Sequence, residues 1–478
     1  MQAVKKNNKC FVVWSKNLDN RLDPYYHKTE FAEIISKIKK GEFKTKTIGE
    51  LSELVKSGST PKASLKCFTE IDGILFIRNT DLKENVIRYG SAKKIKREFE
   101  KNLKGLLLKK GDVLISMAGT IGVSTIYDTS DLATINQNIT LIRFNKEINP
   151  QYAVIWLNTY YFKRLIDRVA TIATIKYVNN EVIKKLPIPV PPLETQNKIV
   201  KLMQSAYDKK IDKEQKAENI LNSVGSYILK ELDIKIENLK NKNCFCINSK
   251  EVEGKRLDPK GYLDTPQTIL KAIKKSAYKT KTLSELLETS IAGEWGEDAT
   301  LENNEGYSLI KVLRNTNFDN QGNLNFSVVA ERFIENNKLA KVELKNGDIL
   351  IEKSGGSPIQ PVGRVALIEN LKDRFTFSNF LQCFRVKKEC IPEYLFCFLK
   401  TLYGLNYMEY LQNQTTGIKN LIMEEYLSIP VPLPPIDTQK KLANEFRDRL
   451  ESATKLKLEA KNEIEKAKQE VESIILGK

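Results

Sequence analysis

The sequence is poor in the residues that most catalytic and metal sites need. Its 478 residues include one histidine, His27. Imidazole is the usual general acid–base group and a frequent zinc ligand, so sites built on histidine are largely excluded. The seven cysteines contain no C-x2-C pair, and Cys383, Cys390 and Cys397 fall seven apart among apolar neighbours. This spacing favours buried, reduced thiols over disulfides or metal ligands.

Long apolar runs are also missing. No stretch approaches the roughly 18 uninterrupted apolar residues of a membrane span, and residues 1–14 lack the apolar core of a signal peptide. We therefore expect a cytoplasmic protein. With 41% hydrophobic residues the chain can bury substantial cores, and its length allows two to four domains.

Charge of one sign is in excess. Lysine and arginine number 77 against 60 aspartate and glutamate residues, which gives a net charge of +17. Such a balance favours polyanionic partners such as nucleic acid. A lysine-rich solubilising surface explains the charge equally well.

A run of alternating proline and aliphatic residues occurs twice, at residues 186–196 and 429–439. Proline cannot continue a helix or donate to a central sheet, so each run predicts an extended segment whose aliphatic side chains pack sideways. After the last proline, Glu194-Thr195-Gln196 and Asp437-Thr438-Gln439 predict helix starts, with the carboxylate at the positive end of the helix dipole.

The two runs are the last of a series of paired motifs that spans most of the chain. The offset between partners grows slowly, from 234 to 243 positions, as expected of a duplication with small insertions. The pairs include residues 21–24 with 256–259 (Arg-Leu-Asp-Pro), 44–47 with 279–282 (Lys-Thr-Lys-Thr), 78–80 with 314–316 (Arg-Asn-Thr), and 111–112 with 347–348 (Gly-Asp).

Each repeat predicts an α+β domain of roughly 180 residues followed by a long helix. Within the domains, helices are expected at residues 26–40, 150–168, 262–275 and 392–411, and strands at 74–77, 112–115 and 139–144. The long helices are expected at 195–239 and 438–476, where there is no proline.

Both long helices carry an apolar seam with a seven-residue period. In the second, Phe446, Ala453, Ala460, Ala467 and Ile474 repeat, whereas lysines interrupt the first. Two such seams in one chain predict a mutual coiled coil, and the connectivity makes it antiparallel. The expected fold is α+β, with two pseudo-two-fold related domains joined and spaced by this coiled coil of about 60 Å. The expected segments are 1–190, 191–242, 243–433 and 434–478.

Catalytic motifs are not convincing. Asp23-Pro24-Tyr25-Tyr26 resembles the box that amino-methyltransferases use to hold a base, but its repeat at 258–261 has no aromatic residue, so a turn or packing role is favoured. The glycine loops at 119–122 and 354–357 lack the Gly-Lys-Ser/Thr of a phosphate-binding loop. No suitably placed acidic pair joins Glu352, so we expect no catalysis by this chain.

Groups suited to DNA recur instead. Lysines suit phosphates, and arginine with asparagine suits guanine and adenine edges. Taken singly, each of these residues could equally well be a polar residue that closes a turn. The residues that read bases could also lie in the loops that differ between the repeats, around 84–104, 120–138, 318–340 and 354–364. The candidates are Lys44, Lys46, Arg78, Asn79, Thr120, Asn136, Gln137, Asn138, Lys176, Lys279, Lys281, Arg314, Asn315, Ser357, Gln360, Arg364, Ser378, Asn379 and Lys419.

Over nearly its whole length the chain resembles the DNA-specificity subunits of type I restriction-modification systems. The resemblance rests on the Arg-Leu-Asp-Pro openings, on residues 111–116, 119–122 and 135–138, and on residues 187–196 with their second copy. Two departures are Glu194-Thr195-Gln196, where the family commonly has the acidic residue directly before Gln, and Thr174, which matches Gly417.

The resemblance implies two target-recognition domains, each of which reads half of a bipartite double-stranded DNA site. It also implies two methyltransferase partner subunits that bind S-adenosylmethionine, with or without an endonuclease subunit, and no cofactor or metal held by this chain. Two alternatives stay open: the recognition part of a modification enzyme that itself carries methyl transfer, and a duplicated coiled-coil adaptor.

Overall fold

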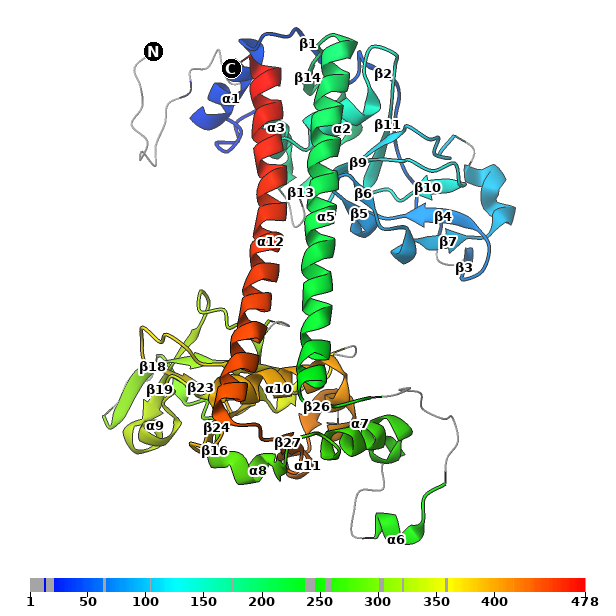
Figure 1. Cartoon of the computed structure of the whole chain (residues 1–478). Helices are drawn as coiled ribbons and strands as arrows, with labels where there is room; N and C mark the ends of the chain where they lie inside the picture. The colour runs from blue at the N-terminus through cyan, green and yellow to red at the C-terminus, as the bar shows by residue number, and fades with distance from the viewer. Residues whose placement is uncertain are drawn as a thin grey trace. The chain divides into compact units, whose positions relative to one another are not determined.

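Two compact units make up the chain in the computed structural model (Figure 1). Unit 1 comprises residues 1–212 and 459–478, and unit 2 comprises residues 213–458. The structure describes residues 13, 21–62, 66–103, 105–172, 176–236, 246–253, 259–300, 305–319, 322–356, 360–415 and 417–477. Cys244, the Arg-Leu-Asp part of the second opening motif (256–258) and Ser357 lie outside these residues. By contacts, each long helix is shared between the units, and the expected four-segment division stays a prediction.

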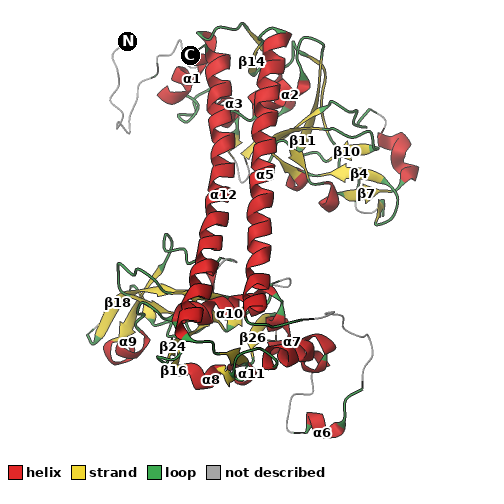
Figure 2. Ribbon diagram, viewed as in Figure 1, coloured by secondary structure: helices red, strands yellow, loops and turns green. Residues whose placement is uncertain are grey.

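Unit 1 contains two four-stranded sheets. The first, in the order β2-β11-β8-β9, is antiparallel throughout; the second has the order β10-β4-β7-β3, with β10 and β4 parallel. Figure 2 shows the first sheet nearer to α5 and the second beyond it. The strand bounds are β2 Ser52–Ser57, β3 Phe68–Thr69, β4 Ile74–Ile77, β7 Lys93–Ile95, β8 Val113–Ser116, β9 Ser124–Ile126, β10 Ala133–Ile135 and β11 Ile139–Phe144.

Unit 2 repeats this topology. Its antiparallel sheet has the order β16-β24-β20-β22, and its mixed sheet has the order β17-β19-β18-β23, with β18 and β23 parallel. The bounds are β16 Leu287–Ala292, β17 Glu297–Asp298, β18 Tyr307–Leu313, β19 Ala330–Glu335, β20 Ile349–Glu352, β22 Val365–Leu367, β23 Phe375–Phe377 and β24 Leu381–Val386. The repeated mixed helix-and-sheet fold confirms the duplication and the α+β class, and the spacing of the domains by a coiled coil stays a prediction. The three expected strands are present as β4, β8 and β11.

Short two- and three-stranded ladders complete the two units. In unit 1 they join β1 (Thr45–Thr47) with β14 (Pro187–Pro189), β5 (Leu82–Lys83) with β6 (Val86–Ile87), and β12 (Thr171–Ile172) with β13 (Lys176–Tyr177). In unit 2 they join β15 (Thr280–Thr282) with β27 (Pro430–Pro432), and β21 (Ser354–Gly355) with β26 (Ile418–Leu421) and β25 (Gln412–Thr415).

The proline runs are extended, as predicted, and each has one strand partner. Ile188 and Val431 lie between the two prolines of their strands and are fully buried. A two-stranded ladder needs donors from only one side, so it tolerates proline where a central strand does not. The runs therefore fasten the end of each domain to its own first strand.

Each unit also contains smaller helices. Unit 1 contains α1 Thr29–Lys39, α2 Pro150–Leu157, α3 Tyr160–Val169 and α4 Asn180–Lys184. Unit 2 contains α6 Ser249–Val252, α7 Asp264–Lys274, α8 Leu283–Leu286, α9 Asn336–Val342, α10 Pro392–Gly404 and α11 Met423–Leu427. The expected helices at 26–40 and 262–275 are confirmed as α1 and α7.

The single helix predicted at 150–168 is wrong, because α2 and α3 are separated at Asn158. The Asn158 amide accepts from the Ser124 N–H at 3.2 Å and donates to the Ser124 carbonyl at 2.8 Å. The Thr159 hydroxyl then caps α3 by accepting from the Phe162 N–H. The helix predicted at 392–411 likewise ends at Gly404, and Asn406 follows in a left-handed conformation. The contact of Asn158 with Ser124 on β9 is absent from the local sequence pattern.

The long helices are α5, Leu193–Glu231, and α12, Ile436–Leu476, and each starts one position before the predicted acidic residue. α5 ends eight residues earlier than predicted. Asp233 adopts a positive φ of 50°, and the Ile234 N–H closes back on the Leu229 carbonyl at 2.8 Å. Burial of Ile234 in the core of unit 2 explains this end, because the turn directs its side chain inward.

The predicted apolar seams are the buried faces of these helices. In α12, Phe446, Ala453, Ala460 and Ala467 are buried, as the heptad pattern predicts, whereas Lys457, a lysine at a seam position, is exposed and interrupts the seam. In unit 2 the two helices run antiparallel: Lys441 near the start of α12 pairs with Glu231 at the end of α5 at 3.2 Å. Further along α12, Arg449 donates to the Ser223 hydroxyl at 3.1 Å and lies over the Tyr227 ring.

In unit 1 the last turns of α12 join the first half of α5 in one core (Figure 1). Val471 and Ile475 of α12 share this core with Ile199 and Met203 of α5. Burial, followed by the charges of Glu84, which lies between β5 and β6, and of Glu465 on α12, raises the pKa of Tyr207 to about 12. No helix in the described part of the chain is long and apolar enough to cross a membrane.

Candidate nucleic-acid interface

The parallel strand pair of each mixed sheet brings two predicted sites together. In unit 1, Arg78 follows β4 and Asn136 follows β10, and the Asn136 N–H donates to the Ile77 carbonyl at 3.0 Å. In unit 2, the Ser378 N–H donates to the Leu313 carbonyl at 2.8 Å, which places Ser378 beside Arg314. The carboxyl ends of parallel strands meet at one edge of a sheet. Arg78 and Asn136, 58 positions apart, and Arg314 and Ser378, 64 positions apart, therefore meet there without any local signal in the sequence.

A third segment crosses the same edge, and it requires glycine. A Cβ on Gly58 would lie 2.1 Å from the Ile135 carbonyl oxygen, and one on Gly293 would lie 2.2 Å from that of Ser378. Only a residue without a side chain allows this approach. The two glycines lie at the same offset as the flanking motifs, a signal that the sequence reading did not use. The crossing places Thr60 in unit 1 and Trp295 in unit 2 at the edge.

Arg78 is held by an internal partner. Its guanidinium makes two hydrogen bonds of 2.9 Å to the Asp81 carboxylate and one of 2.8 Å to the Ser91 carbonyl. Burial alone would raise the pKa of Asp81, but the hydrogen bonds from Arg78 and Ser91 hold it below its usual value. The side chain is thus committed to the domain, and its DNA contact stays a prediction with a competing structural role.

The remaining edge residues of unit 1 are polar and only partly engaged. The Asn79 amide donates to the Ala118 carbonyl at 3.4 Å, and the Gln137 carbonyl oxygen accepts from the Thr60 hydroxyl. The buried Asn136 Oδ1 has no partner among the described residues. Asn138 uses its backbone carbonyl, which accepts from the Met117 N–H, and Thr120 is exposed.

The corresponding edge of unit 2 differs in its side chains. Asn315 lies against Gly355, where an added Cβ would stand 2.3 Å from its amide nitrogen. Ser378 is buried, while Asn379 is exposed. Lys419, on β26, pairs across the strand with Gly355, and its ammonium donates to the Gln360 carbonyl at 3.2 Å. The predicted residues Arg314, Asn315, Ser378, Asn379 and Lys419 therefore gather at this edge.

Two other predicted contacts have internal partners. The Arg364 guanidinium donates twice to the fully buried Glu352 carboxylate, at 2.8 and 2.9 Å, and also to the Asn315 and Phe318 carbonyls. Lys176 donates to Asp167 at 2.7 Å. Arg364 therefore serves the second domain's own structure, and we leave it out of the proposed interface.

The paired lysines near each proline run divide into two kinds. Lys46 pairs with Glu147, and at the repeated position Lys281 pairs with Glu389 at 2.7 Å. The hydrogen bond from Lys46 lowers the pKa of Glu147. Lys44 and Lys279 are exposed, and no ion pair is recorded for either within the described residues. Lys44 and Lys279 are therefore the better candidates for phosphate contacts, which stay a prediction.

The Asp-Pro-Tyr-Tyr segment forms a turn, as predicted. The Asp23 carboxylate accepts from the Tyr25 N–H at 3.0 Å, and the Tyr25 hydroxyl donates to Asp167 at 2.5 Å. The Tyr26 ring is covered by the Arg168 guanidinium, at 3.7 Å from its centroid. Both aromatic rings are occupied by the domain itself, so this turn does not present them to a flipped base.

Each unit also contains a groove at an equivalent position. In unit 1 the groove of about 290 Å³ lies between Ile126 of β9, Gln151 of α2 and Met203 of α5. In unit 2 the groove of about 640 Å³ lies between the corresponding Leu367, Glu393 and Phe446. A surface that recurs with the repeat suits a partner that binds twice.

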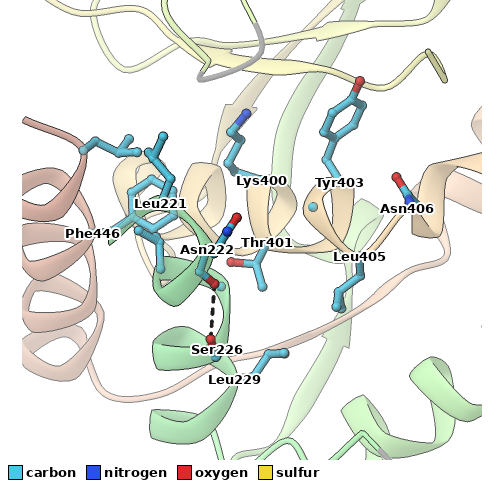
Figure 3. A pocket seen from close by; sticks show the side chains of 14 residues that line it. Leu221, Asn222, Ser226, Leu229, Lys400, Thr401, Tyr403, Leu405, Asn406 and Phe446 are labelled. Carbon is cyan, nitrogen blue, oxygen red and sulfur yellow. Dashed lines mark hydrogen bonds between the residues drawn. The ribbon is translucent and has the colours of Figure 1, made fainter. Parts of the chain in front are cut away.

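A further pocket in unit 2, of about 440 Å³, lies between α5, α10 and α12 (Figure 3). Thr401 faces Asn222 of α5, whereas Lys400 and Tyr403 leave α10 on the other side. Burial lowers the pKa of Lys400 to about 8. The predicted DNA contacts are absent from its lining, so the pocket is separate from the strand edge.

Comparison with known proteins decides the family. The family model described as "Type I restriction modification DNA specificity domain" matches residues 40–223 and 275–466, one match for each repeat. The chain belongs to this family.

Relatives of this specificity-domain protein are similar to it over different shares of its length. A Methanocaldococcus jannaschii protein, named as the MjaX type I restriction enzyme specificity subunit, is 24% identical over 94% of this chain and 95% of its own. The EcoBI specificity subunit of Escherichia coli is 24% identical over 30% of this chain and 31% of its own. A solved structure from work on the assembly and conformational transition of the type I restriction-modification system has a TM-score of 0.52 at 13% identity, covering 91% of this chain and 96% of its own, which supports the fold alone.

The sequence reading of this specificity-domain protein missed the role of Gln196 and Gln439. The Gln196 amide accepts from the Asn149 N–H at 2.8 Å and donates to the Glu147 and Pro191 carbonyls at 3.0 and 2.9 Å. Gln439 makes the same three bonds, each 2.9 Å long, to Ile391, Glu389 and Pro434. Both side chains are fully buried. Their repetition in the sequence was the available signal.

Proposed function

We propose that this chain is the non-catalytic DNA-specificity subunit of a type I restriction-modification complex. It binds a bipartite double-stranded DNA target, and each domain reads one half-site. The observation that carries the proposal is the repeated strand edge, which has the same backbone in both units but different side chains. Shared backbone with divergent polar groups suits two related but unequal DNA sequences.

The charge and the site composition support DNA as the ligand. The net charge of +17 favours a polyanion. The edges present amides and hydroxyls, such as Gln137 and Asn379, that hydrogen-bond to base edges. Exposed Lys44 and Lys279 flank the domains at repeated positions and suit phosphates.

We further propose that the chain recruits two methyltransferase subunits, which bind S-adenosylmethionine, and in some complexes an endonuclease subunit. The recurrent grooves support a partner present in two copies, because each offers the same elements in the same order. Type I assembly is what the name of the solved relative describes.

The long helices set the spacing between half-sites in this proposal. α5 has 39 residues and α12 has 41, so each is about 60 Å long. Paired antiparallel as one coiled coil, they would hold pseudo-two-fold related domains more than one turn of DNA apart, a turn being about 34 Å.

The decisive experiment is methylome sequencing of a host that expresses the chain with its methyltransferase. The chain should direct methylation to a sequence with two short specific blocks and an unspecific spacer. A seven-residue insertion after Asp212 in α5, matched by one after Leu458 in α12, should lengthen the spacer and leave both blocks unchanged, because seven residues keep the apolar seams in register.

A domain exchange provides the matched control. Replacement of residues 10–185 by those of a relative should change one block and keep the spacer. Methylation without a bipartite motif would refute the specificity role. S-adenosylmethionine binding by the isolated chain would instead support an enzyme with its own methyl transfer. A DNA affinity that is unchanged by charge reversal of Lys44 would support an adaptor.

A further inference from the structure

Arg78 and Arg314 occupy the same position in the two repeats. Each follows a parallel strand and precedes a short 3-10 helix, Asn79–Asp81 in unit 1 and Asn315–Asn317 in unit 2. The third residue of this helix differs: it is Asp81 in the first repeat and Asn317 in the second. The difference changes the charge available to pair with the arginine.

Asn317 cannot replace the carboxylate. Its amide oxygen accepts from the Arg314 backbone N–H at 2.9 Å. Its amide nitrogen donates to the Asn325 and Val328 carbonyls, both at 2.9 Å. The amide is neutral and its groups are used on backbone, so the Arg314 guanidinium receives neither charge nor acceptor from it.

The Arg314 guanidinium therefore remains without an acceptor in the described part of the chain. Its Nε is buried and has no hydrogen-bond partner. Its nearest recorded companion is the Trp295 ring, whose centroid is 5.9 Å from the guanidinium carbon. Arg332 lies over the same ring at 4.3 Å, but its charge is paired with Asp298 at 2.8 Å.

A guanidinium held against an aromatic face is fixed in direction, and its planar fork fits a pair of acceptor atoms. Leaving a buried donor unpaired is unfavourable, so an arriving acceptor would gain more here than at a solvated arginine. DNA offers two such acceptor pairs, the O6 and N7 atoms of guanine and the oxygens of a phosphate.

We propose that Arg314 is a DNA contact of the second domain, whereas its counterpart Arg78 is a structural residue. The inference rests on the proposed function and deepens it, since it assigns unequal roles to two arginines that the repeat makes equivalent. The ligand is an acceptor pair on duplex DNA, and Trp295 positions the fork that receives it.

The test compares Arg314→Gln with Arg78→Gln in the full chain. Binding to a labelled duplex pool with a randomised 30-base-pair core is measured from about 50 to 200 mM salt, together with thermal unfolding. Arg314→Gln should weaken DNA binding about 5- to 100-fold with an unchanged or higher Tm. Arg78→Gln should lower the Tm and leave the affinity of the folded protein unchanged.

Two more variants complete the design. Arg332→Gln removes a charge beside the same ring that Asp298 already neutralises, so it should leave the affinity near that of the wild type. Arg314→Lys keeps the charge and loses the fork: retained affinity with an unchanged salt slope identifies a phosphate, and loss with altered selection from the pool identifies guanine. Either result supports the contact.

The outcomes separate this inference from the proposed function. If the wild type binds DNA and Arg314→Gln binds equally well, the contact is refuted and the specificity role stands. If Arg314→Gln loses affinity only to the extent that it unfolds, Arg314 is structural and the inference is also refuted. If the wild type binds no duplex, both fall.

Discussion

The start of each long helix depends on one buried glutamine, and removing its amide should weaken the whole unit. Gln196 joins three backbone groups from two segments: the N–H of Asn149 and the carbonyls of Glu147 and Pro191. Gln439 repeats these bonds in unit 2. In each unit the residues bonded belong to the proline run and to the loop before α2 or α10, so the amide ties the helix to its domain.

The cost of Gln196→Ala can be worked out from these bonds. A typical hydrogen bond contributes about 1 kcal/mol net, and a buried group left without a partner costs about 1–3 kcal/mol. Three bonds give at least about 3 kcal/mol. For a unit of roughly 230 residues, each kcal/mol shifts the Tm by about 2–4 °C, so the expected loss is about 6–12 °C.

The assay is thermal unfolding of the full chain followed by circular dichroism. Gln204→Ala is the control, because Gln204 lies on the same helix, is exposed and, among the described residues, its side chain is recorded only with Asp208. Gln439→Ala should cost as much as Gln196→Ala. Equal Tm values for Gln196→Ala and Gln204→Ala would refute the reasoning, since the buried amide would then contribute no more than an exposed one.

Three further predictions follow from single contacts. Gly58→Ala should cost about 3 kcal/mol through overpacking against the Ile135 carbonyl, while Gly90→Ala, where an added Cβ meets nothing within 4 Å, should change stability by less than about 0.5 kcal/mol; urea titration measures both, and similar midpoints would contradict the clash. Lys44→Glu should reduce the slope of log affinity for DNA against log salt concentration by about 0.9 or more. Lys46→Glu should mainly lower the Tm, because Lys46 faces Glu147. A lower slope for Lys46→Glu and a lower Tm for Lys44→Glu would exchange their roles. Burial lowers the pKa of Lys400 to about 8 in the folded chain, so the unfolded chain binds more protons above that pH, and the stability should rise from about pH 8 to 10.5. Lys400→Met should remove this rise and raise the Tm by about 2–6 °C below pH 8. An unchanged pH profile of the Tm would refute the assignment.

Much of the fold was predictable because its signals are local or repeated. The proline runs predicted extended segments that end at a helix start, and α5 and α12 begin there. The heptad period predicted which faces are buried, and Phe446, Ala453 and Ala460 confirm it. The break at Asn158 was not predictable, because it depends on Ser124, which lies on another strand.

The candidate site was predictable in membership but not in roles. The repeated Arg-Asn-Thr motif made Arg78 and Arg314 candidates, and each directly follows a strand, β4 or β18. The sequence repeat alone assigned Arg78 and Arg314 the same role. The buried Cys383, Cys390 and Cys397 agree with the sequence reading, while Cys246 is exposed.

The sequence by itself determined the duplication, the family resemblance, and the alternation of domain, proline run and long helix, since each is a pattern along the chain. The tertiary structure decided which charges are available. Lys46 is paired across 101 positions with Glu147, and Arg364 is paired with Glu352 beneath the second domain's surface. One carboxylate-to-amide difference, Asp81 against Asn317, separates a neutralised arginine from one that lacks an acceptor, because a charge is satisfied by what lies within about 3 Å of it in space.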